Sequence, residues 1–389
     1  MRTSRPLTAI PPLLKDINER KVLEMIRTAA PISRAEISRR AGISKPTVST
    51  ALQSLLDAGL VREANHKPDG PSYGAVFFEP VPEAALVIGI DLGARFLRGA
   101  ICDLDGKILV RQDLEAGPLE AETAIESIAS LGSSLRAASR LPTTPVDGVV
   151  VGVPGVVDAD TGRVEVVTSV SGLRGREFGR ELHERLGLPV VIENDINLSA
   201  VGEHWSGVAR GVDDFAFLSI GTGVGAGIIL RGELHTGRHG AAGEIDLIAA
   251  DRNDDLDPCA HAVSKLAAEM ASGQADTSLQ PPFETRQIFA AARGGDQVAL
   301  AVTDEVARRI ALNIVALSAV VDVTPIVLGG GIGANGDLLL APIQARLDEW
   351  LPYPPKVEVS SLGDAAVLIG ALGVGLRAAL DNVFANRSR

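Results

Sequence analysis

The sequence predicts two folds in one chain, a small helical domain with a two-stranded wing and a much larger α/β domain behind it. Within residues 31–64, two short helical stretches with capping residues are separated by a glycine turn, and a sequence pattern typical of β-strands continues to residue 80. Further along, glycine-ended strands such as ALVIGIDLG and VDGVVVGVPG alternate with helical stretches, which is typical of an α/β domain. We therefore place the first domain at 1–80 and the start of the second at residue 83.

Length and composition limit the kinds of protein that this chain can be. A chain of 389 residues predicts two or three domains, and 46% hydrophobic residues with only 3% aromatic ones predict a core of Ala, Val, Leu and Ile. No apolar run approaches the roughly 20 residues that span a bilayer, and no signal peptide is visible. Two cysteines, Cys102 and Cys259, cannot form a disulfide framework. We expect a cytoplasmic protein without a membrane segment.

Charge is distributed unevenly along the chain, whose net charge is −12. Residues 1–70 hold 12 of the 37 Lys and Arg residues but only 7 of the 49 Asp and Glu residues, a balance of +5. The remaining 25 basic and 42 acidic residues give a balance of −17. A small basic domain on an acidic body suits a protein that meets phosphates at one end, although +5 over 70 residues is also within ordinary surface variation.

Capping residues set the bounds of two helices in the first domain. Ser33 and Glu36 form an S-x-x-E capping box that opens a short helix, and Gly42 supplies the left-handed turn that ends it. Ser44 then caps a second helix, whose first turn holds Pro46, where a missing N–H costs nothing. Two helices joined by a short turn containing glycine predict a helix-turn-helix.

Flanking segments complete the predicted domain. Residues 17–29 place apolar side chains on one helical face, and Pro31 ends that helix. After the second helix stops at Gly59, LVREA is typical of a strand, NHKPDGPSYG of a turn-rich tip and AVFFEP of a returning strand. The strands and tip form a wing, so the whole segment predicts a winged helix-turn-helix.

The second helix of a helix-turn-helix enters the major groove of DNA with its N-terminus first. Here that end carries short hydroxyl side chains, one lysine and free helix N–H groups, which can contact phosphates and base edges at close range. A helical hairpin used only for packing, with Ser and Thr as caps, is the alternative. We expect DNA contacts from Ser33, Arg34, Ser44, Lys45, Pro46, Thr47, Ser49, Thr50 and Lys67.

The predicted helix-turn-helix resembles the winged-helix part of the ROK family of repressors, open reading frames and kinases. The typical sequence of that part is S-R-x-E-L-A-x-x-x-G-L-S-x-P-T-V-S, and this chain has SRAEISRRAGISKPTVSTALQSLLDAGLV. The resemblance implies a DNA-binding head. One departure lies in the wing, where repressors of the family often carry Gly-Gly-Arg for the minor groove and this chain has GPSYGAVFFEP. Without that arginine, any minor-groove contact would fall to His66 or Lys67.

The resemblance to the ROK family continues from about residue 85 to residue 375. It rests on four segments in family order, namely VGVPGVVDADTGRV, VVIENDINLSAVGEHWSG, IGTGVGAGIIL and IVLGGGIG. In sugar kinases of the family this region is an actin-like, ATP-binding fold of two lobes, each built on a ribonuclease H-like sheet. The resemblance therefore implies a sugar-kinase-type body with one lobe at 83–195, which a C-terminal helix over 365–384 could complete, and a second lobe at 196–364.

The first phosphate loop of the family kinases, D-x-G-G-T-K, is altered here to DLGARF at residues 91–96. Asp91 and Gly93 of the loop are kept, and Arg95 could still bind an anion. Ala94 replaces the second glycine, whose absent side chain lets N–H groups close on phosphate. Because phosphoryl transfer depends on positioning and charge neutralisation, we expect neither kinase activity nor ATP as a cofactor.

The second phosphate loop survives intact as Gly221, Thr222 and Gly223, and so does the adenosine-side run of three glycines at 329–331. Either the loop still meets a nucleotide, or its glycines are kept because strand-to-helix turns in this fold need a positive φ. We prefer the folding reason and treat both loops as vestiges of a nucleotide site.

Two segments carry the residues that the resemblance implies for ligand binding. Asn194 and Asp195 match the family's Asn-Asp pair, in which the Asp is the catalytic base of the kinases and both residues hydrogen-bond the ligand's hydroxyls. The pair could also cap the helix that starts at Asn197, and both roles can hold at once. Glu244 matches the Glu of the family's G-E-x-G-H sugar clamp.

The same clamp departs from the family in ways that bear on metal and ligand. Asp246 and Leu247 stand where the family has Gly and His, and Cys259 with His261 is all that remains of the zinc motif. One thiolate and one imidazole do not make a tetrahedral zinc site, so we expect no structural zinc and no other metal. Loss of the clamp's His also removes a sugar hydrogen bond, so the ligand need not be an ordinary hexose.

These features favour a transcriptional regulator, most simply a repressor, over an enzyme. The expected partners are double-stranded DNA with a palindromic operator, further copies of the chain in a dimer or tetramer, and a small polar effector, a sugar or sugar derivative, bound between the lobes. Two alternatives stay open. A sugar kinase could retain a fused DNA-binding head, and a regulator could keep its body only for dimerisation.

Overall fold

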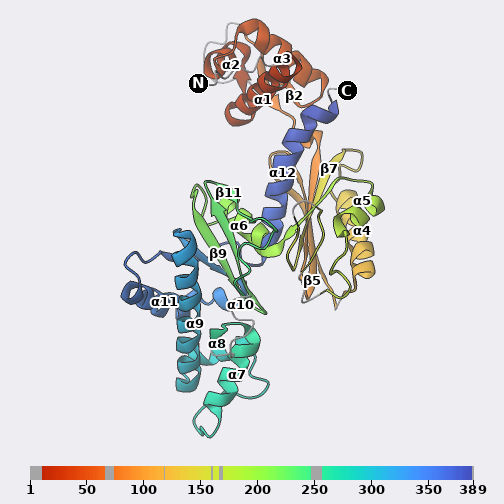
Figure 1. Ribbon diagram of the computed structural model, residues 1–389. Helices are drawn as coiled ribbons and strands as arrows, with labels where there is room; N and C mark the ends of the chain where they lie inside the picture. The colour runs from red at the N-terminus through yellow and green to blue at the C-terminus, as the bar shows by residue number, and fades with distance from the viewer. Residues whose placement is uncertain are drawn as a thin grey trace, which may run out of the picture.

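The computed structural model of the protein describes residues 11–65, 74–117, 119–158, 161–165, 170–246 and 256–387. Figure 1 shows a head at the top, a first lobe below it and a second lobe at the bottom. Helix α12 (Ala366–Arg387) runs from the body up to the head. A winged helix-turn-helix followed by a two-lobed α/β body confirms the predicted fold class.

Local capping chemistry sets the bounds of the head's helices as predicted. The Ser33 side chain accepts from the Glu36 backbone N–H at 3.3 Å, Gly42 takes a φ of 66°, and Ser44 caps the recognition helix. A three-stranded sheet of order β1-β3-β2 closes the domain. The head's elements are α1 (Pro11–Ala29), β1 (Ile32–Ser33), α2 (Arg34–Ala41), α3 (Lys45–Asp57), β2 (Val61–Glu63) and β3 (Phe77–Pro80).

Helix α1 begins at Pro11, earlier than the start predicted at residue 17. Pro11 and Pro12 stand in its first turn, where N–H groups have no helical partner to lose. The wing tip, which includes His66 and Lys67, lies outside the described residues, so the predicted contact from Lys67 stays a prediction.

The first lobe is a five-stranded sheet, β6-β5-β4-β7-β8, with helices on both faces. Because successive strand residues point to opposite faces, Ile88 and Ile90 join the core under α4 and α5, whereas Val87 joins the core with α12. The lobe's elements are η1 (Pro82–Ala84), β4 (Leu86–Leu92), β5 (Phe96–Asp103), β6 (Ile108–Glu115), α4 (Ala121–Ala138), β7 (Val146–Val153), α5 (Phe178–Leu186) and β8 (Val190–Asn194).

The second lobe repeats the same sheet order as β11-β10-β9-β12-β13, with two antiparallel pairs followed by two parallel ones. Helix α6 packs on one face, and the other face covers the core beneath α7, α8, α9 and α11. The elements are α6 (Asp195–Ser206), β9 (Phe215–Ile220), β10 (Val224–Leu230), β11 (Glu233–Leu234), α7 (Ala260–Ala271), α8 (Thr285–Arg293), α9 (Gln297–Val321), β12 (Ile326–Gly329), α10 (Gly330–Gly333), α11 (Gly336–Trp350), β13 (Val357–Val359) and η4 (Gly363–Ala365).

Helix α12 ties the three parts together. The segment Gly363–Leu380, which covers η4 and most of α12, is long and apolar enough to cross a membrane by length and composition alone, contrary to the expectation that no such run exists. In the structure Leu368, Leu372 and Leu376 are buried in one apolar cluster that also contains Val22 of the head. The buried side of α12 therefore belongs to a core that the head and the first lobe share, and the head is packed directly on that lobe.

Candidate functional site

The N-terminal half of α3 presents the polar side chains predicted to contact DNA. Ser44, Lys45, Pro46 and Thr50 are exposed, whereas Val48 is fully buried beneath them. The 3.6-residue period of the helix produces this division, because the apolar positions of α3 recur on the side that packs against α1 and α2. The exposed positions form one surface at the helix N-terminus.

Hydroxyl groups on this surface are held by the helix itself. The Ser44 Oγ accepts from the Thr47 backbone N–H at 3.3 Å and lies 2.8 Å from the Thr47 Oγ1. The Ser49 and Thr50 hydroxyls donate to backbone oxygens one turn earlier, at 2.9 and 3.2 Å. Each hydroxyl oxygen retains acceptor capacity, so capping and DNA contact are compatible roles for these side chains.

Basic residues of the head differ in how they are paired. Glu36 forms ion pairs with both Arg39 and Arg40, and these hydrogen bonds lower the pKa of Glu36. Within the described part of the chain, Arg34 and Lys45 form no ion pair and are exposed. Their charges are therefore available to meet DNA phosphates.

Asn194 and Asp195 stand where β8 ends and α6 begins. The Asn194 Oδ1 accepts from the Ile196 and Asn197 N–H groups at 2.8 and 2.9 Å, and its Nδ2 donates to the Gly155 oxygen at 3.0 Å. Asn194 is the helix cap, so α6 starts at Asp195 rather than at the predicted Asn197. The cap leaves the half-buried Asp195 carboxylate at the helix N-terminus.

Carboxylates from both lobes influence one another around this helix start. The pKa of Asp195 is raised to about 7, mainly because the carboxyl is removed from water. The negative charges of Asp91 and Glu244 raise it further. Burial raises the pKa of Asp91 to about 6, although Arg98 opposes the shift. Burial and the nearby Asp246 raise the pKa of Glu244. Three predicted residues, Asp91, Asp195 and Glu244, thus form one electrostatically coupled group.

The raised pKa values predict that the protein loses stability as pH rises from about 4 to 7. In the unfolded chain these carboxyls ionise near their ordinary pKa of about 4, so between the two values the folded state holds more protons. The protonated carboxyls therefore stabilise the folded protein fully below their unfolded-state pKa of about 4. This contribution is lost as pH rises through their folded-state pKa values of about 6 and 7. We expect a lower urea midpoint at about pH 8 than at about pH 5.5, with a smaller difference in Asp195→Asn. Equal pH dependence in the two proteins would contradict the assignment.

Arg98 of β5 belongs to none of the predicted sequence motifs, although it stands at the site. Its guanidinium lies 3.0 Å from Asp91, 3.7 Å from Asp113 and 3.9 Å from Asp364, and it is 3.9 Å from where a Cβ on Gly93 would stand. Asp91 and Arg98 are directly opposed in the β4–β5 hairpin, so strand register fixes the pair. A tethered cation therefore lies against the first phosphate loop.

The rest of the first loop offers little to a phosphate. The Gly93 N–H already donates to the Phe96 oxygen at 3.0 Å. Arg95 is exposed and lies over the Phe96 ring, with its guanidinium carbon 5.9 Å from the ring centroid. The predicted anion contact from Arg95 thus has no backbone N–H from Gly93 to support it.

A need for positive φ, the folding reason predicted above, does not explain Gly221 and Gly223 of the second loop. Gly221 and Gly223 do not take a positive φ, and a Cβ on either would make only ordinary contacts, at 3.7 and 3.8 Å. The folding reason holds instead for Gly330, which has a φ of 76°. A Cβ on this glycine would lie 2.3 Å from the Ile220 backbone oxygen. Thr222 is exposed. The atom that a Cβ on Gly223 would meet at 3.8 Å belongs to the Asp246 carboxylate, so negative charge lies beside this loop.

Other contacts hold the region of the altered zinc motif. The Cys259 Sγ donates to the Asp257 Oδ2 at 2.8 Å, and the Asp257 backbone oxygen accepts from Arg309 at 2.9 Å. His261 is exposed, and Leu247 lies outside the described residues. In the part of the chain that the structure describes, no group of three or more His, Cys, Asp or Glu side chains is placed to hold a metal ion.

The chain matches two family models. Residues 15–62 match a winged helix-turn-helix DNA-binding model, and residues 87–376 match the model of the ROK family. The xylose repressor of Caldicellulosiruptor bescii is 26% identical over 386 residues, which cover 93% of this chain and 96% of that protein.

Solved structures share the same architecture. A ROK family transcriptional regulator, a homologue of the E. coli MLC protein, matches 96% of this chain and 98% of its own with a TM-score of 0.80, and its 22% identity shows a common fold. A ROK family glucokinase from Streptomyces griseus, in complex with glucose and AMPPNP, is 27% identical with a TM-score of 0.62 and covers 74% of this chain and 98% of its own. Because the ROK model spans well over half of the chain, this protein belongs to the ROK family.

Proposed function

We propose that this chain is a transcriptional repressor whose head binds operator DNA and whose ROK body senses a small sugar or sugar derivative. The observation that carries the proposal is the head, whose recognition helix exposes Lys45 and several hydroxyl groups while its core is continuous with the body. The similarity to a xylose repressor extends over both parts of the chain. A repressor acts where the DNA is, so the proposal includes a cytoplasmic location.

The effector follows from the chemistry of the coupled carboxylates. Asp195 and Glu244 can accept hydrogen bonds from hydroxyl groups, and Asn194 keeps one amide N–H to donate. Their negative charge, together with Asp91 and Asp246, disfavours an anionic ligand. A neutral sugar or an amino sugar therefore suits this group better than a sugar phosphate does.

The repressor would read DNA as a symmetric oligomer. One recognition helix contacts one half-site, and two half-sites about one helical turn apart need two heads related by a two-fold axis. We therefore propose at least a dimer on a palindromic operator. Sedimentation of the full chain with and without an operator fragment measures the stoichiometry directly.

A structural route joins the sensing residues to the head. Asp195 begins α6, which packs against the lower part of α12 (Figure 1). Helix α12 then contributes Leu372 and Leu376 to the apolar cluster that contains Val22 and Ile26 of α1. A ligand that moves α6 therefore acts on the element that supports the DNA-binding head.

Phosphoryl transfer fits this chain poorly. Arg98, bound to Asp91, lies against the first loop, and Asp246 stands beside Gly223 of the second. We infer that the body acts without ATP, zinc or another metal, as a sensor and not as an enzyme. A kinase fused to a DNA-binding head is the second candidate, because Asp195 with a pKa near 7 suits a general base. Release of ADP with hexoses, pentoses or amino sugars, abolished by Asp195→Asn, would establish the kinase instead.

Footprinting on the promoter region beside the protein's own gene tests the repressor. We expect symmetric protection whose affinity changes roughly 5- to 150-fold with an effector sugar, the range of typical coupling free energies. The panel contains xylose, glucose and N-acetylglucosamine. Asp195→Asn should protect the same DNA but lose its response to the sugar. No protection at moderate salt would overturn the proposal.

A further inference from the structure

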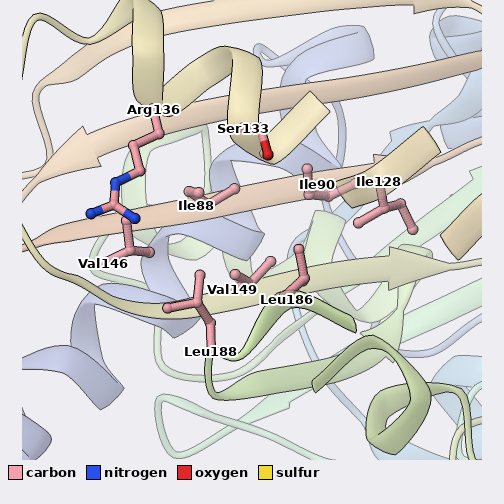
Figure 2. A pocket seen from close by; sticks show the side chains of 10 residues that line it. Ile88, Ile90, Ile128, Ser133, Arg136, Val146, Val149, Leu186 and Leu188 are labelled. Atoms are coloured by element: carbon pink, nitrogen blue, oxygen red, sulfur yellow. The ribbon is translucent and has the colours of Figure 1, made fainter. Parts of the chain in front are cut away.

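A small cavity lies in the first lobe between the sheet and the helices α4 and α5, on the face opposite α12. Its volume is about 90 Å³. Figure 2 shows the aliphatic side chains that line it, contributed by β4, β7, α4 and the end of α5. Those used below are Ile128, Val149, Leu186 and Leu188. We propose that this cavity binds a short, branched aliphatic carboxylate whose charged end pairs with Arg136.

Gly132 keeps the cavity open. It is buried near the middle of α4, and a Cβ built on it would meet no heavy atom within 4 Å. Glycine in a helix interior is less stable than alanine by roughly 0.5–1 kcal/mol, so this position carries a cost that packing does not require. Gly99 beneath the same helix differs, because its Cβ would lie 2.9 Å from Leu131 and Leu135. The missing side chain of Gly132 thus supplies space and nothing else.

Arg136 provides the charge at one end of this space. It follows Gly132 by four residues, so both lie on the same side of α4. Its Nε donates to the Pro142 oxygen at 3.1 Å, which fixes the guanidinium. Figure 2 shows the guanidinium at the far end of the lining from Ile128. Among the described residues Arg136 forms no ion pair, and its two terminal nitrogens can receive a carboxylate in the forked geometry that arginine favours.

Volume and lining select the rest of the ligand. The cavity of about 90 Å³ is smaller than the roughly 150 Å³ cavity that accepts benzene. Its walls at Val149, Leu186 and Leu188 offer no hydrogen bonds to a polar chain. The Ser133 hydroxyl, which also lines the cavity, donates to the Ala129 oxygen at 2.9 Å. A branched group of three or four carbons fits these limits, as in isobutyrate or isovalerate.

Calorimetric titration of the full chain with isovalerate tests the proposal. We expect saturable binding that weakens at least tenfold in Gly132→Leu, which fills the cavity, and about tenfold in Arg136→Gln, which removes the charge. Isovaleramide should bind the wild type and Arg136→Gln equally, because it lacks the carboxylate. Acetate, which has the charge without the branched chain, should not bind measurably.

A second, smaller substitution separates loss of binding from loss of folding. Gly132→Ala takes up one methyl group of the space and should bind isovalerate more weakly than the wild type while its thermal midpoint is raised. The proposal is overturned if the wild type gives no heat with millimolar isovalerate, if Gly132→Leu binds as well as the wild type, or if acetate binds equally. DNA binding plays no part in these measurements, so their outcome is independent of the repressor function.

Discussion

Replacing Lys45 with glutamate is expected to weaken operator binding by at least tenfold. Lys45 is the first residue of the recognition helix, it is exposed, and it forms no ion pair within the described residues. The substitution puts a negative charge where the helix N-terminus would otherwise meet phosphates, and loss of one such contact already weakens binding uniformly across sequences. Binding titrations at several salt concentrations measure the effect. In Lys45→Ala the slope of log affinity against log salt should fall by about one.

Arg39→Ala is the matched control for this prediction. Arg39 is equally basic and exposed in the same domain, but its guanidinium is paired with Glu36. Its removal also frees the Glu36 carboxylate only partly, because Arg40 remains bound to it. We expect a much smaller loss of affinity than in Lys45→Glu. If the two variants bind the operator equally well, α3 is not the recognition helix.

Local chemistry explains why the head could be predicted closely from its residues. A cap, a left-handed glycine and a proline act within one helical turn, so Ser33, Gly42 and Ser44 carry their structural meaning wherever the rest of the chain lies. The start of α1 was predicted late because the apolar periodicity begins after its first turns. Pro11 and Pro12 were the available signal.

The candidate ligand site was predicted less completely, because its geometry depends on strand register and on segments far apart in the chain. Asp91 was singled out from its motif, whereas Arg98 becomes its partner only when β4 and β5 pair across their turn. Folding the sequence DLGARFLR (residues 91–98) into a hairpin places the two opposite each other. No pattern near Asp364 shows that η4, just before α12, approaches the same arginine.

Glycines show the same difference between local and long-range causes. The φ of a turn glycine can be anticipated from its neighbours, but close approach between distant helices cannot. Gly202 of α6 and Gly370 of α12 stand at such an approach. A Cβ on Gly202 would lie 2.4 Å from the Ala366 oxygen, and one on Gly370 would lie 1.8 Å from the Leu198 oxygen. Nothing in the sequence around either glycine predicts this contact.

Gly370→Ala is expected to destabilise the protein by at least the upper end of the roughly 1–3 kcal/mol that overpacking costs. The obstacle to the new methyl group is the backbone of Leu198, which cannot rotate away as a side chain can. Since α6 begins with Asp195 and α12 packs against the head, separation of the two helices should also weaken operator binding and reduce its response to sugar. Urea unfolding and operator titration measure the two effects.

Gly132→Ala is the matched control, because it makes the same chemical change in the interior of another helix. Its new methyl group meets nothing within 4 Å, so the higher helix propensity of alanine should raise stability by about 0.5–1 kcal/mol. The two substitutions should therefore move the urea midpoint in opposite directions. A Gly370→Ala protein that is as stable as the wild type, and that still releases DNA when sugar is added, would show that α6 and α12 can separate at no cost. The coupling between ligand and head would then have to follow another path.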